Sequence, residues 1–175
     1  MIVLKTGPLE LREMTPDDFE ELHVVFSDPI AMRYYPRPFT REMTTGWIEW
    51  NLRNYEQYGF GLWAVMHTED ERLIGDCGLT IQLVDGVEEL EIGYHILRSY
   101  WGQGLATRCA TACRDYAFDE LKRERVISWM NPANTASRRV AEKIGMHLEK
   151  ETVDSHGKPA VVYSMTPADR RLQGS

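Results

Sequence analysis

The sequence has 175 residues, of which 43% are hydrophobic and 27% charged, and its formal net charge is −7. This length fits one domain with a single core, and the composition is that of a globular protein, which excludes a disordered or membrane-spanning chain. The excess of acidic residues disfavours general nucleic-acid binding, because phosphate backbones are bound by clustered basic surfaces.

The spacing of the three cysteines and five histidines is not that of a disulfide framework or of a metal site. Cys109 and Cys113 are four residues apart and share one face of a predicted helix, where we interpret them as small core residues. We therefore expect no metal. The N-terminal residues lack the basic region and long apolar stretch of a secretory signal, so we expect a cytoplasmic protein without membrane partners.

The first predicted elements are one strand and two helices. The alternating residues Leu9–Met14 predict a half-buried strand. The following 15–18 segment predicts a helix start, because it offers a Thr N-cap, Pro at the first helical position and two acids near the positive helix end. A second helix is expected from the N-cap Thr40 to about Tyr58, with Gly59 ending it.

Three strand patterns then follow in close succession. They cover Phe60–His67, Arg72–Leu83 and Glu89–Leu97, and polar turns separate them at Thr68–Glu71 and Asp85-Gly86. Such short spacings predict an antiparallel meander.

The C-terminal half predicts two helices, a buried strand and a hairpin. The expected elements are a helix over 105–117, a strand over Arg125–Met130, a helix that begins near Asn134 and is closed by Gly145, and a hairpin of Met146–Val153 with Ala160–Met165. We expect residues 1–168 to form one domain and residues 169–175 a polar C-terminal tail.

The turn Trp101–Ala106 is the most informative segment of the chain. A strand leads into this turn, which holds Gly102 and Gly104 and continues directly into a helix, so that backbone N–H groups converge at a positive helix end and favour phosphate. The alternative is a helix-starting turn that uses glycine only for backbone freedom. A dinucleotide fingerprint needs a glycine where Thr107 stands, and the P-loop signature is missing from the sequence.

Two motifs together resemble the GNAT superfamily of N-acetyltransferases. Tyr100–Thr107 is similar to the Tyr-Trp-Gly-x-Gly-x-Ala-Thr run of the branch that acetylates ribosomal-protein N-termini. Residues Asn134–Gly145 are similar to the same branch's Asn-x-x-Ser-x-x-x-x-Glu-Lys-x-Gly. The chain departs from the wider pattern at Trp101, where the superfamily has Arg or Gln, and at Arg108, where many relatives have Glu.

The resemblance implies an α+β GNAT fold, with a central, mostly antiparallel, twisted sheet of about six to seven strands and about four helices. It also implies acetyl-CoA as the cofactor and direct attack by a primary amine in a ternary complex. In this family a backbone N–H of the fourth strand holds the thioester carbonyl, and the equivalent of Asn134 binds the pantetheine arm, although Asn134 also suits a helix N-cap. The implied cofactor-binding residues are Ile96, Leu97, Arg98, Gly102, Gln103, Gly104, Leu105, Ala106, Thr107 and Asn134.

The implied catalytic residues are Glu91 and Ser137. Glu91 is expected to receive the proton of the amine, while the nearby Glu88 and Glu89 are interpreted as solvated. His95 is the alternative base, since it shares a strand face with Glu91 unless a bulge intervenes. Ser137 either approaches the cofactor sulfur or bonds its own backbone as an ordinary first-turn serine.

The acceptor is expected to be a protein N-terminus or a small-molecule amine. The acidic chain suits a cationic acceptor. Aromatic residues of the first two helices and their connection are expected to wall the acceptor site, most of them serving as core: Tyr34, Tyr35, Trp47, Trp50, Tyr55 and Tyr58. The competing hypotheses are a longer-chain acyltransferase and a non-catalytic acyl-CoA-binding module, and the protein is expected to be a monomer or homodimer.

Overall fold

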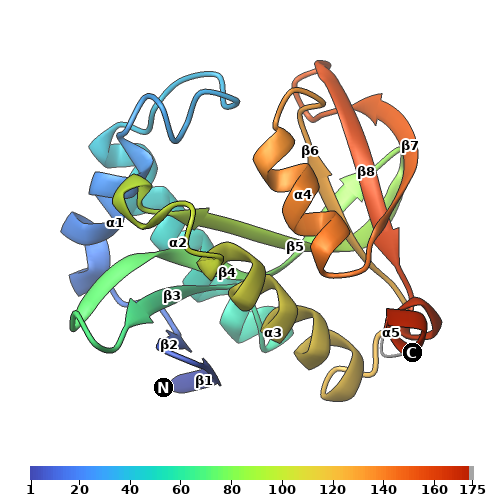
Figure 1. The fold of residues 1–175 in the computed structure, drawn as a ribbon. Helices are drawn as coiled ribbons and strands as arrows, with labels where there is room; N and C mark the ends of the chain where they lie inside the picture. Colours follow the sequence, from blue (N-terminus) through green and yellow to red (C-terminus); the bar gives the residue numbers. More distant parts are fainter. Residues whose placement is uncertain (174–175) are drawn as a thin grey trace.

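An eight-stranded sheet in the order β1-β2-β3-β4-β5-β6-β8-β7 forms the centre of the computed structural model, which describes residues 1–173 (Figure 1). Only β5 and β6 run parallel among these neighbours. The strands are β1 (Ile2–Thr6), β2 (Leu9–Arg12), β3 (Leu62–His67), β4 (Arg72–Val84), β5 (Val87–Ile96), β6 (Val126–Met130), β7 (His147–Val153) and β8 (Pro159–Met165). The predicted mixed, mostly antiparallel sheet is confirmed, with more strands than the expected six to seven.

Among residues 1–173, five α-helices surround the sheet. They are α1 (Phe19–Phe26), α2 (Arg41–Tyr58), α3 (Leu105–Asp119), α4 (Thr135–Lys143) and α5 (Pro167–Gln173). Short 3₁₀ turns precede α1 and α3, namely η1 (Pro16–Asp18) and η2 (Arg98–Tyr100). No helix among residues 1–173 is long and apolar enough to cross a bilayer.

The predicted helix ends of the N-terminal half are confirmed. The Thr40 hydroxyl accepts the Met43 N–H at 3.3 Å, and α2 ends at Gly59. At the start of η1, Asp18 accepts the Thr15 N–H at 2.7 Å and forms an ion pair with Arg12. These caps satisfy backbone N–H groups that the first turn of each helix leaves unpaired.

The predicted meander is confirmed as β3, β4 and β5. The register between β4 and β5 is unbroken from the Gly75–Ile96 pair to the Val84–Val87 pair. Because side chains alternate along a strand without a bulge, Glu91, Gly93 and His95 lie on one face of β5. That face meets α1 and α2, since the His95 ring contacts Phe26 and Trp47.

The opposite face of the meander packs against α3. The three cysteines are fully buried there, and the Sγ atoms of Cys77 and Cys113 are 3.6 Å apart. Their predicted role as core residues is confirmed.

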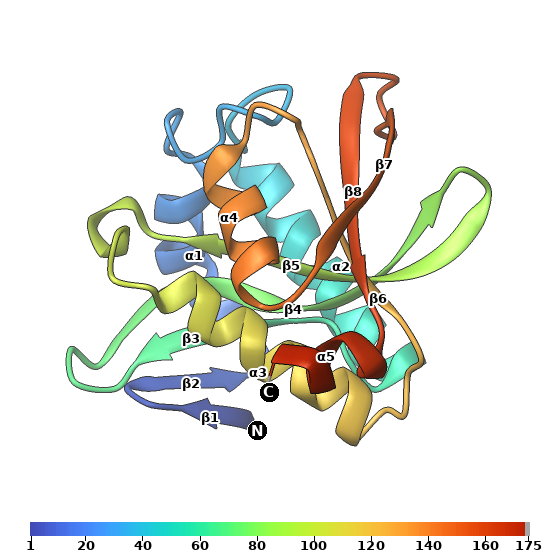
Figure 2. The same ribbon diagram turned by 45° about the vertical axis from the view of Figure 1, so that its right-hand side comes forward.

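The sheet opens between β5 and β6. Within residues 1–173, β5 and β6 pair at a single position, Glu91 with Ile127, and then diverge. Figure 2 shows β5 continuing beside α1 while β6 turns away with α4, β7 and β8. The C-terminal part of β5 therefore has a free edge on the side that β6 has left.

Two elements were not predicted. β1 pairs with β2 at the edge of the sheet. In α5, Arg170 forms hydrogen bonds to Asp119 at 2.7 and 2.8 Å, which fastens the helix to the end of α3. The prediction of a polar tail from Asp169 is therefore wrong as far as Gln173, and the last two residues of that segment lie outside the described residues.

Candidate active site

The turn after β5 has the geometry of an anion cradle. Gly102 and Gly104 adopt φ angles of 77° and 74°, and a Cβ added at either would meet no atom within 4 Å. The first backbone bond of α3 runs from the Arg108 N–H to the Gly104 carbonyl at 3.0 Å. The N–H groups of residues 105–107 thus have no acceptor within the helix, and they point to the open space above the turn.

Aromatic residues fasten this turn at both sides. The Trp101 indole donates to the Ile96 carbonyl at 2.7 Å, and the Tyr100 hydroxyl donates to the Asp70 carboxylate at 2.6 Å. Trp101 therefore connects the turn to the end of β5, and Tyr100 connects it to the loop between β3 and β4. These bonds give a physical role to the Tyr-Trp pair of the motif.

The two nearby cations, Arg98 and Arg108, lie against the protein in different ways. The Nε of Arg98, one of the implied cofactor-binding residues, donates to Asp28 at 2.8 Å and forms an ion pair with it. The Arg108 Nη1 lies 2.7 Å from the position that a Cβ on Gly7 would occupy, so its guanidinium faces the turn between β1 and β2. An open pocket of about 460 Å³ lies beside the ion pair and is lined by Val24, Asp28, Leu97, Arg98 and Ser99.

The backbone N–H groups of Ile96 and Leu97, the two implied cofactor-binding residues at the end of β5 that could hold the thioester carbonyl, point in different directions. The His95 carbonyl oxygen faces β4, since it lies 1.9 Å from where a Cβ on Gly75 would stand. Peptide groups alternate along a strand, so the Ile96 N–H faces the open side. The Leu97 N–H donates to the Ile74 carbonyl at 2.7 Å and is already engaged. Of the two candidates, Ile96 is the one whose N–H is directed at the opening.

The start of α4 approaches the same edge from the other half of the molecule. The Asn134 Oδ1 accepts the Ser137 N–H at 3.2 Å, which confirms Asn134 as the N-cap of α4. The Tyr94 hydroxyl donates to the Ser137 carbonyl at 3.3 Å. This bond connects the first turn of α4 to β5.

Glu91 is a half-buried carboxyl without a partner. Burial raises its pKa to about 8, and no hydrogen bond or ion pair of this carboxyl is seen within residues 1–173. Its Oε1 lies 3.8 Å from the position of a Cβ on Gly93. Since Gly93 has no side chain, the Glu91 carboxyl lies above it, in the interval between Glu91 and His95.

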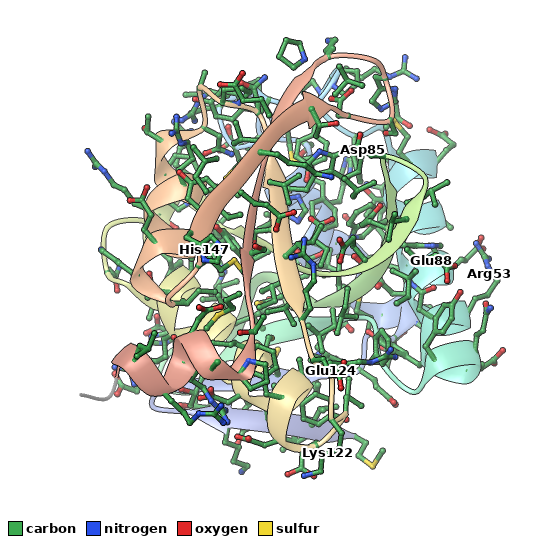
Figure 3. All side chains as sticks on the ribbon, turned by 90° about the vertical axis from the view of Figure 1, so that its right-hand side faces the viewer. Arg53, Asp85, Glu88, Lys122, Glu124 and His147 are labelled. Atoms are coloured by element: carbon green, nitrogen blue, oxygen red, sulfur yellow. The ribbon has the colours of Figure 1, made fainter. Side chains whose placement is uncertain are left out.

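The other two acidic residues of this strand behave differently from each other. Glu89 accepts from the Arg125 Nε at 3.0 Å, and its side chain is only 15% exposed. The interpretation of Glu89 as solvated is therefore wrong. Glu88 is exposed, as expected, and points outward from the β4–β5 hairpin in Figure 3.

His95 is held on both sides of its ring. Its Nδ1 lies 2.7 Å from the Asp76 Oδ1, and its Nε2 lies 2.5 Å from the Tyr35 hydroxyl oxygen. The fully buried Asp76 also accepts the Trp47 indole N–H at 2.8 Å. The sequence interpretation did not include Asp76, although an acid inside an otherwise apolar strand was a visible signal.

The predicted aromatic wall divides between site and core. Tyr35 and Trp47 contact His95, whereas the Tyr55 hydroxyl bonds the backbone of β3 and Tyr58 stacks on Phe60. Three of the six pack against the core, namely Trp47, Trp50 and Tyr55, while Tyr35 and Tyr58 are exposed. The expectation that most of them serve as core is therefore wrong, and Tyr35 and Trp47 reach the face of β5 that carries Glu91.

Comparison with known proteins identifies the family. Residues 8–147 match the acetyltransferase (GNAT) domain family. The chain is 38% identical over 161 residues to the uncharacterised protein YkkB of Bacillus subtilis, which covers 91% of this chain and 93% of YkkB. It is 34% identical over 142 residues to the probable N-acetyltransferase YjcK of the same organism, which covers 81% and 74% of the two chains.

A solved structure shares the fold. RimL, a ribosomal L7/L12 alpha-N-protein acetyltransferase in complex with coenzyme A, superimposes with a TM-score of 0.78 over 95% of this chain and 98% of that chain. At 18% identity this likeness shows the fold alone.

The splayed sheet, the anion cradle at the end of β5 and the relatives define an N-acetyltransferase. The chain belongs to the GNAT acetyltransferase family, whose members use acetyl-CoA. The resemblance seen in Tyr100–Thr107 and Asn134–Gly145 is thereby confirmed.

Proposed function

We propose that this protein transfers the acetyl group of acetyl-CoA directly to a primary amine in a ternary complex. The observation that carries the proposal is the joint placement of two features on β5. The strand ends in a turn with unpaired backbone N–H groups, and one of its faces carries a half-buried carboxyl with a raised pKa. An anionic coenzyme and a basic acceptor thus find suitable partners on the same strand.

The residues at the open edge fit acetyl-CoA. The backbone of Gly102–Thr107 would hold the pyrophosphate, because side chains at the two glycines would project into the space above the turn. The Asn134 side chain and the Ile96 N–H would hold the pantetheine arm and the thioester carbonyl. When bound, the coenzyme supplies the acetyl group as an activated thioester.

Glu91 would receive a proton from the amine. A carboxyl with a pKa of about 8 is poised near neutral pH, where general bases are most effective. Ser137 would place the sulfur or protonate the departing thiolate. Direct attack needs no covalent enzyme intermediate.

The acceptor would be a protein N-terminus or a small-molecule amine. RimL is by its name a protein N-terminal acetyltransferase, but this superfamily grafts many acceptors onto one coenzyme site. Cytoplasmic location and a monomeric or homodimeric state are further proposals, made from the sequence.

The test is a screen for release of free CoA from acetyl-CoA. The panel should contain diamines, amino acids, aminoglycosides and peptides with free Ala, Ser or Met N-termini, with butyryl-CoA and octanoyl-CoA run in parallel. We expect acetyl-CoA to be turned over with at least one amine. Mass spectrometry should then find a product about 42 Da heavier than the amine, which corresponds to one added acetyl group.

Two results would contradict this function. Preference for the longer acyl-CoA substrates would make the protein a longer-chain acyltransferase. Calorimetric binding of acetyl-CoA without turnover of any amine would make it a non-catalytic binding module.

A further inference from the structure

A continuous line of hydrogen bonds runs from the interior of the sheet to the face of β5 that meets α1 and α2, which is the proposed acceptor face. It begins at Asp76, which is fully buried, passes through both nitrogens of His95, and ends at Tyr35, which is 40% exposed. The three residues come from β4, β5 and the connection between α1 and α2. A buried carboxylate is thereby linked to a tyrosine of the exposed α1–α2 connection.

The partners of Asp76 fix the direction in which protons are donated along this line. Both carboxylate oxygens accept, one from the Trp47 indole at 2.8 Å and the other from His95 at 2.7 Å. The His95 Nδ1 therefore carries the proton, and the Nε2 of the neutral ring presents its lone pair to the Tyr35 hydroxyl. Tyr35 donates to His95, and its oxygen keeps lone pairs for another partner.

Tyr35 stays a neutral phenol at this position. Burial of its hydroxyl raises the pKa of Tyr35 above its ordinary value, and the charges of Glu91 and Asp76 raise it further. A neutral phenol between an imidazole and a substrate can pass a proton by accepting one and releasing its own.

The line runs over the face of β5 that also carries Glu91. Glu91 and His95 share a face of β5, and only the side-chain-free Gly93 lies between them on that face. The groups that face His95 are Asp76 from β4, Tyr35 from the α1–α2 connection and, farther along β5, Glu91. The helices α1 and α2 contribute only the uncharged rings of Phe26 and Trp47.

An amine that arrives as an ammonium ion must lose two protons. One leaves before the nitrogen attacks, and the other leaves when the N–C bond forms and the C–S bond breaks. Glu91 can hold one of them. A second acceptor on the same face meets the remaining need.

We propose that Asp76, His95 and Tyr35 form a proton relay that receives the second proton of the acceptor nitrogen. This inference rests on the proposed acetyl transfer. The Tyr35 oxygen takes the proton from nitrogen while its own proton passes to the His95 Nε2, and the resulting imidazolium is stabilised by the Asp76 carboxylate. His95 returns the proton to solvent through Tyr35 after the product leaves.

Tyrosine variants test the relay in the active enzyme. Tyr35→Phe removes the hydroxyl, and Tyr58→Phe is the matched control, because Tyr58 is 41% exposed and stacks on Phe60 at the far end of α2. With an amine found in the CoA-release screen, we expect Tyr35→Phe to lower kcat about 10²-fold, the lower end for one acid–base group, while the KM for acetyl-CoA stays constant. We expect Tyr58→Phe to match the unmodified protein.

A second measurement needs neither coenzyme nor acceptor. Imidazole ¹⁵N NMR of the free protein should find neutral His95 as the Nδ1–H tautomer, and Asp76→Asn should shift the ring toward the Nε2–H tautomer. An Nε2–H tautomer in the unmodified protein would overturn the relay, because Tyr35 could not then donate to His95.

The outcomes separate the relay from the reaction. If the unmodified protein acetylates an amine and Tyr35→Phe is as active as Tyr58→Phe, the relay is wrong and the acetyl transfer stands. If the unmodified protein releases no CoA with any amine, the proposed function is wrong, and the relay is wrong with it.

Discussion

At the scale of single residues, Glu91 owes its raised pKa to burial alone. A carboxyl with a pKa of about 8 is largely protonated at pH 7 and becomes a base as the pH passes 8. Its Oε1 lies 3.8 Å from the position of a Cβ on Gly93, on the face of β5 that meets α1 and α2. The same burial that makes ionisation costly therefore makes Glu91 suitable for exchanging a proton near neutrality.

Replacement of Glu91 should change the pH dependence of catalysis. In the unmodified protein, kcat/KM for the amine should rise with pH until about pH 8, because only ionised Glu91 accepts a proton. Glu91→Gln should lower kcat by about 10²–10⁴-fold and flatten this acidic limb, without changing the affinity for acetyl-CoA measured by calorimetry. Near-normal kcat with an unaltered profile would show that Glu91 is not the base.

The residues of the site differ in how far the sequence predicted them. Asn134 and Ser137 belong to a local motif, and Glu91 stands in the strand pattern that leads into the Trp101–Ala106 turn, so all three can be read from neighbouring positions. The contacts of His95 cannot, because Asp76 is 19 positions and Tyr35 is 60 positions away in the sequence. Such pairings depend on strand register and on the path of a loop, which only the folded chain determines.

At the scale of elements, the turn before α3 combines left-handed backbone with open space. Gly104→Val should weaken acetyl-CoA binding about tenfold or more, because a branched side chain would occupy the space above the unpaired N–H groups. Isothermal calorimetry measures this affinity, and circular dichroism checks that the fold is retained.

Gly157→Val is the matched control for this substitution. Gly157 has a φ of 73° in the turn between β7 and β8, and a Cβ there also meets no atom within 4 Å. Both variants introduce the same backbone strain, so a similar fall in Tm is expected for each. Equal acetyl-CoA affinities in the two variants would rule out the turn as the pyrophosphate site.

Most elements were predictable because they carry local signals. Thr40 and Gly59 mark the ends of α2, and polar turns separate the strands of the meander. β1 is a short edge strand, and its formation depends on what it packs against, which local propensity does not contain. The start of α5 does carry a local signal, because Thr166-Pro167-Ala168-Asp169 repeats the Thr-Pro-x-Asp pattern of residues 15–18, and Asp169 accepts the Thr166 N–H at 2.7 Å. The sequence interpretation did not use this signal, and the bonds of Arg170 to Asp119 add tertiary support to the helix.

At the scale of the whole molecule, β5 connects two halves that carry different parts of the site. Its open edge lies toward α4, and one of its faces lies toward α1 and α2 (Figure 1). In the proposed reaction, the parting of β5 and β6 would let the coenzyme and the acceptor approach one strand from different directions, and the backbone of β5 that β6 leaves unpaired would hold the thioester.

The buried Glu91 should also affect the stability of the whole molecule as the pH changes. Its pKa rises from an ordinary value of 4.5 to about 8 on folding, so between these values the unfolded chain binds fewer protons than the folded one. Stability is then lost as the pH rises from about 4.5 to 8, because ionisation favours the unfolded state. Glu91→Gln removes this loss, whereas Glu88→Gln, at an exposed position of the same strand, does not.

Thermal unfolding of the three proteins at pH 5 and pH 8.5 measures this linkage. The Tm of Glu91→Gln relative to the unmodified protein should increase between the two pH values by at least about 2 °C, the shift that corresponds to roughly 1 kcal/mol for a chain of this size. A fixed cost of the buried amide cancels in this comparison, because it is the same at both pH values. A constant Tm difference would show that Glu91 ionises as easily in the folded protein as in the unfolded one. The raised pKa would then no longer support Glu91 as the base.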